Sequence, residues 1–422
     1  MPHADQRSHV RELARQVARL AASPENAAIM QRWRDVNALR VPDRAPVWCR
    51  PVGAWGELLP EEALLCRDEW LRGVERHLRM ILIKCDIGDD SPVDPFYPVG
   101  AAIRCDPPNV WGVDIGRHMP GRGGGAWAYD PPLVTEADFD RLQMPRFSVD
   151  HEATERELER AHELVGDVLP PQLVCSTPLC PTLGTDAADL RGLEQMTLDM
   201  PLAPELMHRL MAHIRDANLQ AVDDLEATGL LTRNNVGPMT CSEPVGPETA
   251  DGHITRANLW AMANSQEFDH VSPAMWDEFC LAYQRPILER YGLVGYGCCE
   301  SLTHKIDGVL SIPNLRIFVC SGWTDLDRVI ERVGDRHVIM WRQKASEVVF
   351  PNDPAVLARH LDDGMRRLRG CHVQVVLREL QTLAGHPDGL HVWTKLAIEA
   401  AERYSQSNTT PSSSPGVSAS AL

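Results

Sequence analysis

The alternation of apolar and polar positions is most regular from Leu293 to the end of the folded part of the chain. Short apolar runs are followed there by stretches with helical spacing, which predicts four strand–helix units in succession. The predicted strands are Leu293–Gly297, Leu315–Cys320, His337–Trp341 and His372–Leu377. The predicted helices are Thr303–Leu310, Asp325–Val333, Pro354–Arg369 and Asp388–Arg403. Such an alternation indicates parallel strands joined by right-handed crossovers.

The earlier part of the chain is less regular. Helical spacing covers the first 36 residues, where Val10, Leu13, Val17 and Leu20 share a face, and then Cys66–Leu82, Glu136–Leu142, His151–Val165, Ala187–Leu198, Pro204–Thr228 and Pro273–Tyr291. Strands are expected at Pro46–Pro51, Val99–Arg104, Val110–Ile115, Leu173–Leu179 and Leu259–Ala263.

The predicted strands are apolar almost throughout, as expected when helices cover a parallel sheet. A doubly wound sheet and a (β/α)8 barrel both fit this pattern. Because no nucleotide-binding fingerprint opens any strand–helix unit, we favour an α/β fold of the TIM barrel type. We expect a helical extension over residues 1–40, the barrel over 41–404, and a disordered tail over 405–422 that is rich in Ser, Thr and Pro and lacks charge.

Composition narrows the class of protein further. The chain has 42 Lys and Arg against 59 Asp and Glu, a net charge of −17, which argues against nucleic acid or an anionic membrane as a partner. No stretch has the length of a membrane span, and the first residues do not resemble a signal peptide. The 12 scattered cysteines suggest reduced thiols in the cytoplasm. Composition excludes these classes but names no function; a small-molecule substrate is expected from the candidate site residues that follow.

In a parallel barrel the carboxyl ends of the strands form the active site, so polar residues at those positions are the candidates. They are Arg50, Gln266, Cys298, Cys299, Glu300, Trp323, Arg342, Glu379 and Gln381, with His386 in the loop after the last strand. Arg50 and Arg342 suit a carboxylate-bearing substrate, since arginine binds carboxylates bidentately, and an ion pair across the barrel is the alternative.

Three further features each have a chemical and a structural interpretation. Cys298 and Cys299 are adjacent at a strand end, where side chains point to opposite sides, so at most one is expected to face the mouth, as a zinc ligand, a nucleophile or a packed thiol. Asp86, in the acidic run Cys85–Pro92, could act in acid–base or metal chemistry, whereas capping and turn formation is the structural alternative. The glycine-rich run Gly121–Gly125 is read as a loop or lid in preference to a phosphate cradle, because no helix start follows it.

Several segments resemble the uroporphyrinogen decarboxylase-like superfamily and its less characterised bacterial branch. They are Leu190–Glu194, Asn258–Phe268, Tyr296–Glu300 and Ile312–Arg316, and the resemblance runs from about Pro46 to Tyr404. It implies a (β/α)8 barrel. It also implies either decarboxylation of a tetrapyrrole or transfer of methyl groups between a corrinoid cofactor and a thiol or other acceptor.

Two motifs of the superfamily are matched only in part by this chain. Pro46–Arg50 is similar to the start of the decarboxylases' arginine-rich motif, whose later part is replaced here by Gly53-Ala54-Trp55, and Asp86 corresponds to their substrate-binding aspartate. The methyltransferases hold zinc with a His-x-Cys pair and a distant Cys. Here Tyr296-Gly297-Cys298 occupies the pair, and the distant position falls near Glu379–Gln381, where no Cys is present.

The leading hypothesis is a cytoplasmic barrel enzyme that transfers a methyl group between a corrinoid (cobalamin) and a small acceptor. Cys298, with Cys299, would hold zinc or the acceptor, Glu300 would support it, and Arg50, Asp86 and Glu379 would line the mouth. A decarboxylase acting on a tetrapyrrole or other carboxylated substrate is the first alternative, and a non-catalytic tetrapyrrole- or metal-binding protein is the second. The partners considered are a corrinoid protein and a second copy of the chain in a homodimer.

Overall fold

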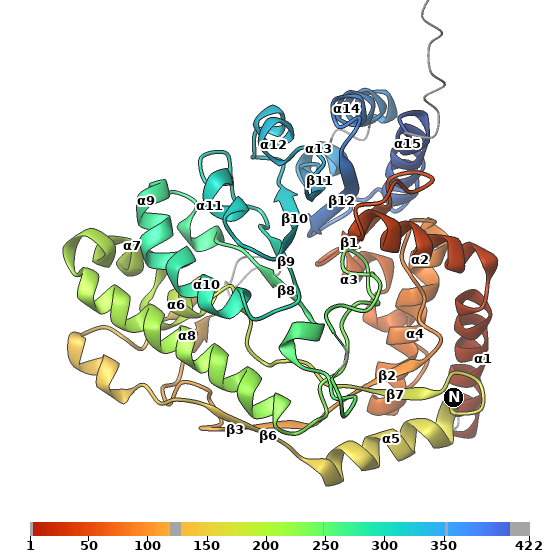
Figure 1. Cartoon of the computed structure of the whole chain (residues 1–422). Helices are drawn as coiled ribbons and strands as arrows, with labels where there is room; N and C mark the ends of the chain where they lie inside the picture. The colour runs from red at the N-terminus through yellow and green to blue at the C-terminus, as the bar shows by residue number, and fades with distance from the viewer. Residues whose placement is uncertain (1–2, 119–127, 248, 351–352, 406–422) are drawn as a thin grey trace, which may run out of the picture.

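The computed structural model describes residues 3–118, 128–247, 249–350 and 353–405 (Figure 1). The glycine-rich run Gly121–Gly125 and the part of the predicted tail from residue 406 onward lie outside the described residues. Within the described ranges, no helix is long and apolar enough to cross a membrane.

A parallel sheet of six strands is the centre of the molecule (Figure 1). Its spatial order is β1-β12-β11-β10-β9-β8, and every neighbouring pair is parallel. The strands are β1 (Val47–Pro51), β8 (Trp260–Ala263), β9 (Leu293–Tyr296), β10 (Leu315–Cys320), β11 (Val338–Arg342) and β12 (His372–Leu380). The four strand–helix units predicted after Leu293 are confirmed, because β9 to β12 and the helices between them follow in that order.

The prediction of a closed eight-stranded barrel is wrong. Two further strands, β2 (Tyr97–Gly100) and β7 (Pro171–Val174), pair in parallel with each other as a separate ribbon. In chain order these two and the six sheet strands make the eight strands of a barrel, and the first strand, β1, pairs with the last, β12, as in a barrel. Among the described residues, however, no ladder joins β1 to β2 or β7 to β8. The sheet is therefore curled but open.

The gap between β1 and β2 has its physical reason at the edge of β1 that pairs with no strand. Asp90 Oδ2 accepts a hydrogen bond from the Val47 N–H at 2.7 Å, and Asp89 Oδ2 accepts one from the Cys49 N–H at 2.8 Å. The Asp90 N–H donates to the Val47 carbonyl at 2.8 Å, and Lys84 donates to the Cys49 carbonyl. Because these groups satisfy the edge of β1, no neighbouring strand is needed there.

The two faces of the sheet differ in what covers them. One face packs against the surrounding helices, while Trp48, Val319, Met340 and Val376 on the other face cluster with Trp33 of helix α2 (Pro24–Asn37). Side chains two residues apart on a strand share a face. The next inward-facing positions toward the carboxyl ends of β1, β11 and β12 are therefore occupied by Arg50, Arg342 and Arg378.

Helix α2 closes the amino-terminal end of this inner face. The Asn37 carbonyl accepts a hydrogen bond from Arg316 of β10, and its side-chain oxygen accepts one from Gln374 of β12 at 2.9 Å. With one end closed in this way, polar side chains at the carboxyl end are the ones that remain accessible to a ligand.

Helices surround the sheet and the β2–β7 ribbon (Figure 1). They are α1 (His3–Ala21), α3 (Trp55–Leu58), α4 (Glu69–Ile87), α5 (His151–Val165), α6 (Gly184–Arg191), α7 (Leu193–Leu202), α8 (Pro204–Glu226), α9 (Pro273–Trp276), α10 (Ala282–Leu288), α11 (Ile306–Leu310), α12 (Leu326–Val333), α13 (Ala345–Val349), α14 (Pro354–Arg367) and α15 (Gly389–Arg403). Two short antiparallel pairs complete the fold: β3 (Ile103–Asp106) with β6 (Arg146–Val149), and β4 (Gly116–His118) with β5 (Ala128–Asp130).

Several predicted elements are divided or absent, for local reasons. The first helix breaks where Ser23 caps a new helix by accepting from the Asn26 N–H at 3.1 Å, with Pro24 in its first turn. The predicted helix Ala187–Leu198 breaks at Gly192, whose φ is +83°. No strand forms at Val110–Ile115, where Val110 has a φ of +68°.

Candidate active site at the carboxyl ends of the strands

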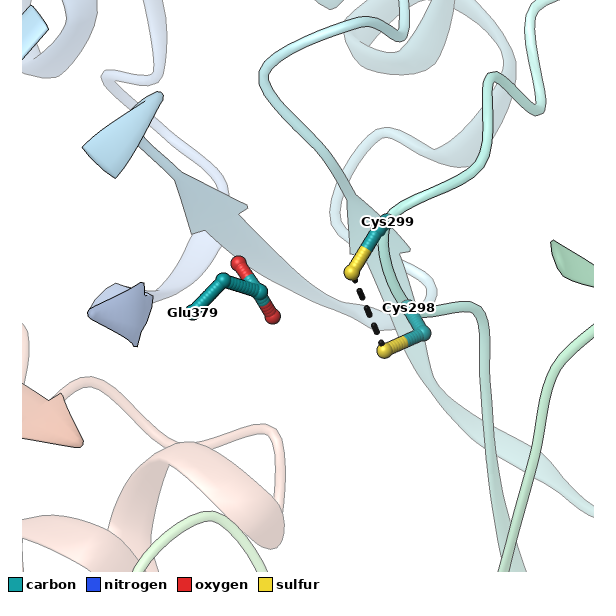
Figure 2. A group of neighbouring side chains, drawn as sticks. All are labelled: Cys298, Cys299 and Glu379. Carbon is teal, nitrogen blue, oxygen red and sulfur yellow. Dashed lines mark hydrogen bonds between the residues drawn. The ribbon is translucent and has the colours of Figure 1, made fainter. Parts of the chain in front are cut away.

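The carboxyl ends of β9, β11 and β12 bring together four candidates from three distant parts of the sequence. Cys298 and Cys299 follow β9, Arg342 ends β11, and Glu379 lies near the end of β12. The two sulfurs and a Glu379 carboxylate oxygen all lie within 4.8 Å of one another (Figure 2). This group, Cys298–Cys299–Glu379, is hereafter called the dithiol site.

The expectation that only one of the adjacent thiols faces the mouth is wrong. The Sγ atoms of Cys298 and Cys299 lie 3.5 Å apart, and both face Glu379 (Figure 2). Strand β9 ends at Tyr296, and Gly297 follows with a φ of +113°. Because the chain has already left the strand, the alternation of side chains no longer applies to these two residues.

The Cys298 thiol is poised to ionise. Its pKa is lowered to about 6, first because Cys299 donates its S–H to Cys298, and then, against the opposing effect of burial, because of the positive charges of Arg342 and Arg378. Because Cys299 is the donor of this hydrogen bond, the pKa of Cys299 is raised. The pair therefore holds one thiolate and one thiol near neutral pH, with the negative charge on Cys298.

Arg342 connects the parts of the site. Its side chain is 2% exposed, and its Nη1 donates to the Cys298 carbonyl at 2.9 Å and to Glu379 Oε1 at 3.2 Å. The same nitrogen lies 3.6 Å from Cys298 Sγ. One buried guanidinium thus contacts the backbone, the thiol and the carboxylate of the site.

Glu300 lies behind the thiols and holds their loop in place. Its buried carboxylate accepts hydrogen bonds from the Cys298 N–H at 2.9 Å and from the Ser265 N–H at 2.8 Å. Burial raises the pKa of this carboxyl group in spite of these hydrogen bonds. The arrangement makes Glu300 a positioning residue for Cys298.

The site carries more positive than negative groups. Arg378 forms an ion pair with Glu379 at 3.8 Å, and its buried Nε has no hydrogen-bond partner among the described residues. The pKa of Arg378 is lowered first by burial and then by the charge of Arg342, with a further contribution from Arg50. Arg342 and Arg378 therefore share one carboxylate and one thiolate, and Arg50 adds a third positive charge to the same face, which favours an anionic ligand.

The donor set of the dithiol site fits zinc. Zinc binds thiolate sulfur at about 2.3 Å in a tetrahedral arrangement, so two zinc-bound sulfurs lie about 3.8 Å apart. The observed 3.5 Å between the two sulfurs is close to this separation. Two thiols and a carboxylate would leave a fourth position open, as in catalytic zinc sites.

The remaining candidates lie outside this group. The side chain of Asp86 is 79% exposed and pairs with His391 of α15 at 3.1 Å. Trp323 is 65% exposed and stacks under Lys344, whose Nζ lies 4.2 Å from the ring centre. Gln266 is partly buried in a short helical turn, Gln266–Phe268, and Gln381 and His386 are exposed after β12. Their predicted roles remain predictions.

Arg378 belongs to the site, although from the sequence it was counted only among the polar residues at strand ends and was given no role. The signal was present, because Arg378 directly precedes Glu379 at the end of a predicted strand. Its inward orientation depends on the register of β12 with β1, in which Val376 faces Trp48. That register is a property of the folded sheet.

No protein-family model matches the chain, and no curated protein matches it. Among solved structures, the chain is similar to a methyltransferase from Methanosarcina mazei, with a TM-score of 0.49 and 10% identity over 89% of this chain and 98% of that one. A likeness of this degree carries no argument about activity, so the superfamily resemblance stays a prediction.

Proposed function

We propose that the protein transfers a methyl group between a corrinoid and a small acceptor at the dithiol site. The observation that carries this proposal is the Cys298 thiol, whose pKa is lowered to about 6 at the accessible end of the sheet. A thiolate is the nucleophilic form of cysteine and also the form that binds metals. Placement at the carboxyl ends of parallel strands is typical of active sites in α/β folds.

The residues of this chain would have distinct tasks in the reaction. Arg342 and Arg378 stabilise negative charge on the acceptor sulfur or on Cys298. Without a metal, Cys299 holds the proton that the pair retains, and this proton would be released when both thiols bind zinc. Glu300 fixes the backbone of Cys298. Cys298, Cys299 and Glu379 would hold zinc, which, when bound, lowers the pKa of a thiol and keeps it ionised. The methyl carbon forms a bond to sulfur, while the bond to its carrier breaks and leaves its electron pair on the carrier.

The experiment measures metal content and methyl transfer on the same purified samples. Wild-type protein is expected to contain about one zinc per chain and to consume methylcobalamin in the presence of 2-mercaptoethanol, seen as a change in corrinoid absorbance. Cys298→Ser and Glu379→Gln are expected to lose both properties. Cys180→Ser is the matched control, because Cys180 is an exposed cysteine outside the dithiol site. Methyl transfer that is unchanged in Cys298→Ser would contradict the proposal.

A decarboxylase is the second candidate, and the arginines favour it. Arg50, Arg342 and Arg378 converge on the inner face, and such a group suits a substrate with several carboxylates. Titration with a porphyrin carboxylate, followed by its absorbance, separates the two functions. Tight binding and release of CO2, without consumption of methylcobalamin, would support decarboxylation.

A further inference from the structure

Cys298 and Cys299 are neighbours in the chain, and both of their side chains face the same part of the dithiol site (Figure 2). Their Sγ atoms lie 3.5 Å apart, whereas the sulfurs of a disulfide lie about 2 Å apart. A movement of about 1.5 Å would therefore bring the two sulfurs to bonding distance. The pair can thus undergo covalent chemistry that is distinct from metal binding and from methyl transfer.

The backbone holds Cys298 more firmly than Cys299. The Cys298 N–H donates to Glu300 Oε2 at 2.9 Å, and the Cys298 carbonyl accepts from Arg342 Nη1 at 2.9 Å. Among the residues that the structure describes, the backbone N–H and carbonyl of Cys299 make no hydrogen bond. Rotation of Cys299 can therefore close the gap between the sulfurs while Cys298 keeps its contacts.

A bond between these two sulfurs is suited to reversible oxidation. Both cysteines are only partly buried, so their thiols are accessible to a small oxidant. Adjacent Cα atoms lie about 3.8 Å apart, which is less than the usual separation of about 4.4–6.8 Å across a disulfide. A disulfide between neighbours is therefore strained, and strained disulfides are readily reduced.

We propose that hydrogen peroxide converts Cys298 and Cys299 into a reversible disulfide. The Cys298 thiolate, with Arg342 Nη1 3.6 Å from its sulfur, attacks one oxygen of the peroxide, so that the O–O bond breaks and Cys298 becomes a sulfenic acid. The departing hydroxide takes up the proton that Cys298 had released and forms water. The Cys299 sulfur then bonds to the Cys298 sulfur, the S–O bond breaks, and the oxygen leaves as water with the Cys299 proton. Two thiols and one peroxide thus give one disulfide and two waters, because two electrons pass from the sulfurs to the peroxide.

This disulfide would inactivate the dithiol site. It removes two of the three donor atoms, because zinc binds thiolates, and it leaves only the carboxylate of Glu379. Cys298 would also lose its nucleophilic form until a thiol reductant restores it. Formation of the disulfide does not depend on methyl transfer, whereas its consequence for zinc rests on the proposed function.

The first experiment detects the disulfide on the full chain, freed of metal with a chelator and treated with hydrogen peroxide. Free thiols are alkylated with iodoacetamide before digestion with trypsin. Peptide 291–305 contains Cys298 and Cys299 and no other cysteine. In wild-type protein this peptide is expected to become lighter by two hydrogen atoms, and its alkylation is expected to fall at least about tenfold. Dithiothreitol is expected to restore the alkylation.

Two variants test the order of the steps. Cys299→Ser lacks the second thiol, so Cys298 is expected to stop at the sulfenic acid, which dimedone traps. Cys180→Ser is the matched control, because Cys180 is an exposed cysteine outside the dithiol site, and it is expected to form the disulfide like wild type. The proposal is overturned if peroxide leaves both thiols of wild type free, if they are oxidised separately to sulfinic acids, if dithiothreitol does not restore them, or if Cys299→Ser gives no dimedone adduct.

A second measurement follows the metal. Zinc-loaded protein is expected to release about one zinc per chain on oxidation, detected with a coloured chelator, and to bind it again after reduction. Zinc that stays bound after the disulfide has formed would contradict the inactivation of the site. A chain that forms the disulfide but never binds zinc would refute the zinc site of the proposed function and leave the disulfide supported.

Discussion

Cys298 and Cys49 are both thiols beside a basic side chain, yet their acidities shift in opposite directions. The pKa of Cys298 is lowered to about 6, whereas burial first, and then the charge of Asp89, raise the pKa of Cys49 to about 12. The basic group is even closer at Cys49, whose Sγ lies 3.0 Å from Lys84 Nζ. A nearby cation is therefore not sufficient to activate a cysteine.

The difference lies in what else each cation and thiol contacts. Lys84 forms an ion pair with Asp89, whose side chain is fully buried, so the positive charge of Lys84 is neutralised by that carboxylate. At the dithiol site two arginines share one carboxylate, Glu379, and the Cys299 S–H donates a hydrogen bond to the Cys298 sulfur. The balance of charges, together with a donated S–H, decides which thiol is reactive. Cys49 is structural, and Cys298 is the candidate for chemistry.

The largest expected effect is on thiol alkylation by iodoacetamide. At pH 7 a thiol with a pKa of about 6 is mostly ionised, whereas one with a pKa of about 12 is ionised in about one molecule in 10⁵. Cys298 is therefore expected to be labelled at least about 10³ times faster than Cys49, as followed by mass spectrometry of peptides. The rate at Cys298 should fall as the pH falls through about 6, because the thiolate is then protonated. Equal rates at the two cysteines would refute the comparison.

The next largest effect is the stability that the Lys84–Asp89 ion pair beside Cys49 gives to the fold. Asp89→Asn removes the charge that compensates buried Lys84 and is expected to lower the free energy of unfolding by about 3 kcal/mol, measured by urea denaturation. It should also increase labelling of Cys49, because the charge of Asp89 helps to raise the pKa of that thiol. Asp86→Asn is the matched control on the same acidic run: Asp86 is 79% exposed, so a change within about 0.5 kcal/mol is expected.

The smallest of the three effects is the contribution of Arg342 to the low pKa of Cys298. Arg342→Met removes a positive charge that lowers the pKa of Cys298, so the pKa should rise toward the ordinary value of about 8.5. The labelling rate of Cys298 at pH 7 is then expected to fall, though by less than the roughly 30-fold that a full return to about 8.5 would give, because the Cys299 hydrogen bond remains. Thiolate absorbance near 240 nm should titrate at higher pH. Arg290→Met serves as the control, because Arg290 is an exposed arginine outside the dithiol site. An unchanged titration curve would show that Cys299 alone accounts for the low pKa.

Much of the fold was predictable because it follows from local periodicity. The strand–helix units after Leu293 are apolar strands followed by amphipathic helices, and they form in the expected order. Whether the barrel closes was not predictable in the same way. Closure requires β1 to pair with β2 and β7 to pair with β8, and apolar spacing along the chain does not show whether these strands pair. The carboxylates of Asp89 and Asp90 accept hydrogen bonds from the backbone of β1, and the spacing of apolar residues does not predict such contacts.

The sequence alone determined which residues stand at strand ends, and so it identified Cys298, Arg342 and Glu379 as members of one site. Tertiary structure decided how they meet. Gly297 and Glu379 have φ values of +113° and +63°, and these departures from strand geometry turn both thiols and the carboxylate toward one another. The register of β1, β11 and β12 decided that three arginines share the inner face. Spacing along the chain predicts elements, but the orientation of side chains beyond a strand end depends on backbone angles and registers that exist only in the folded protein.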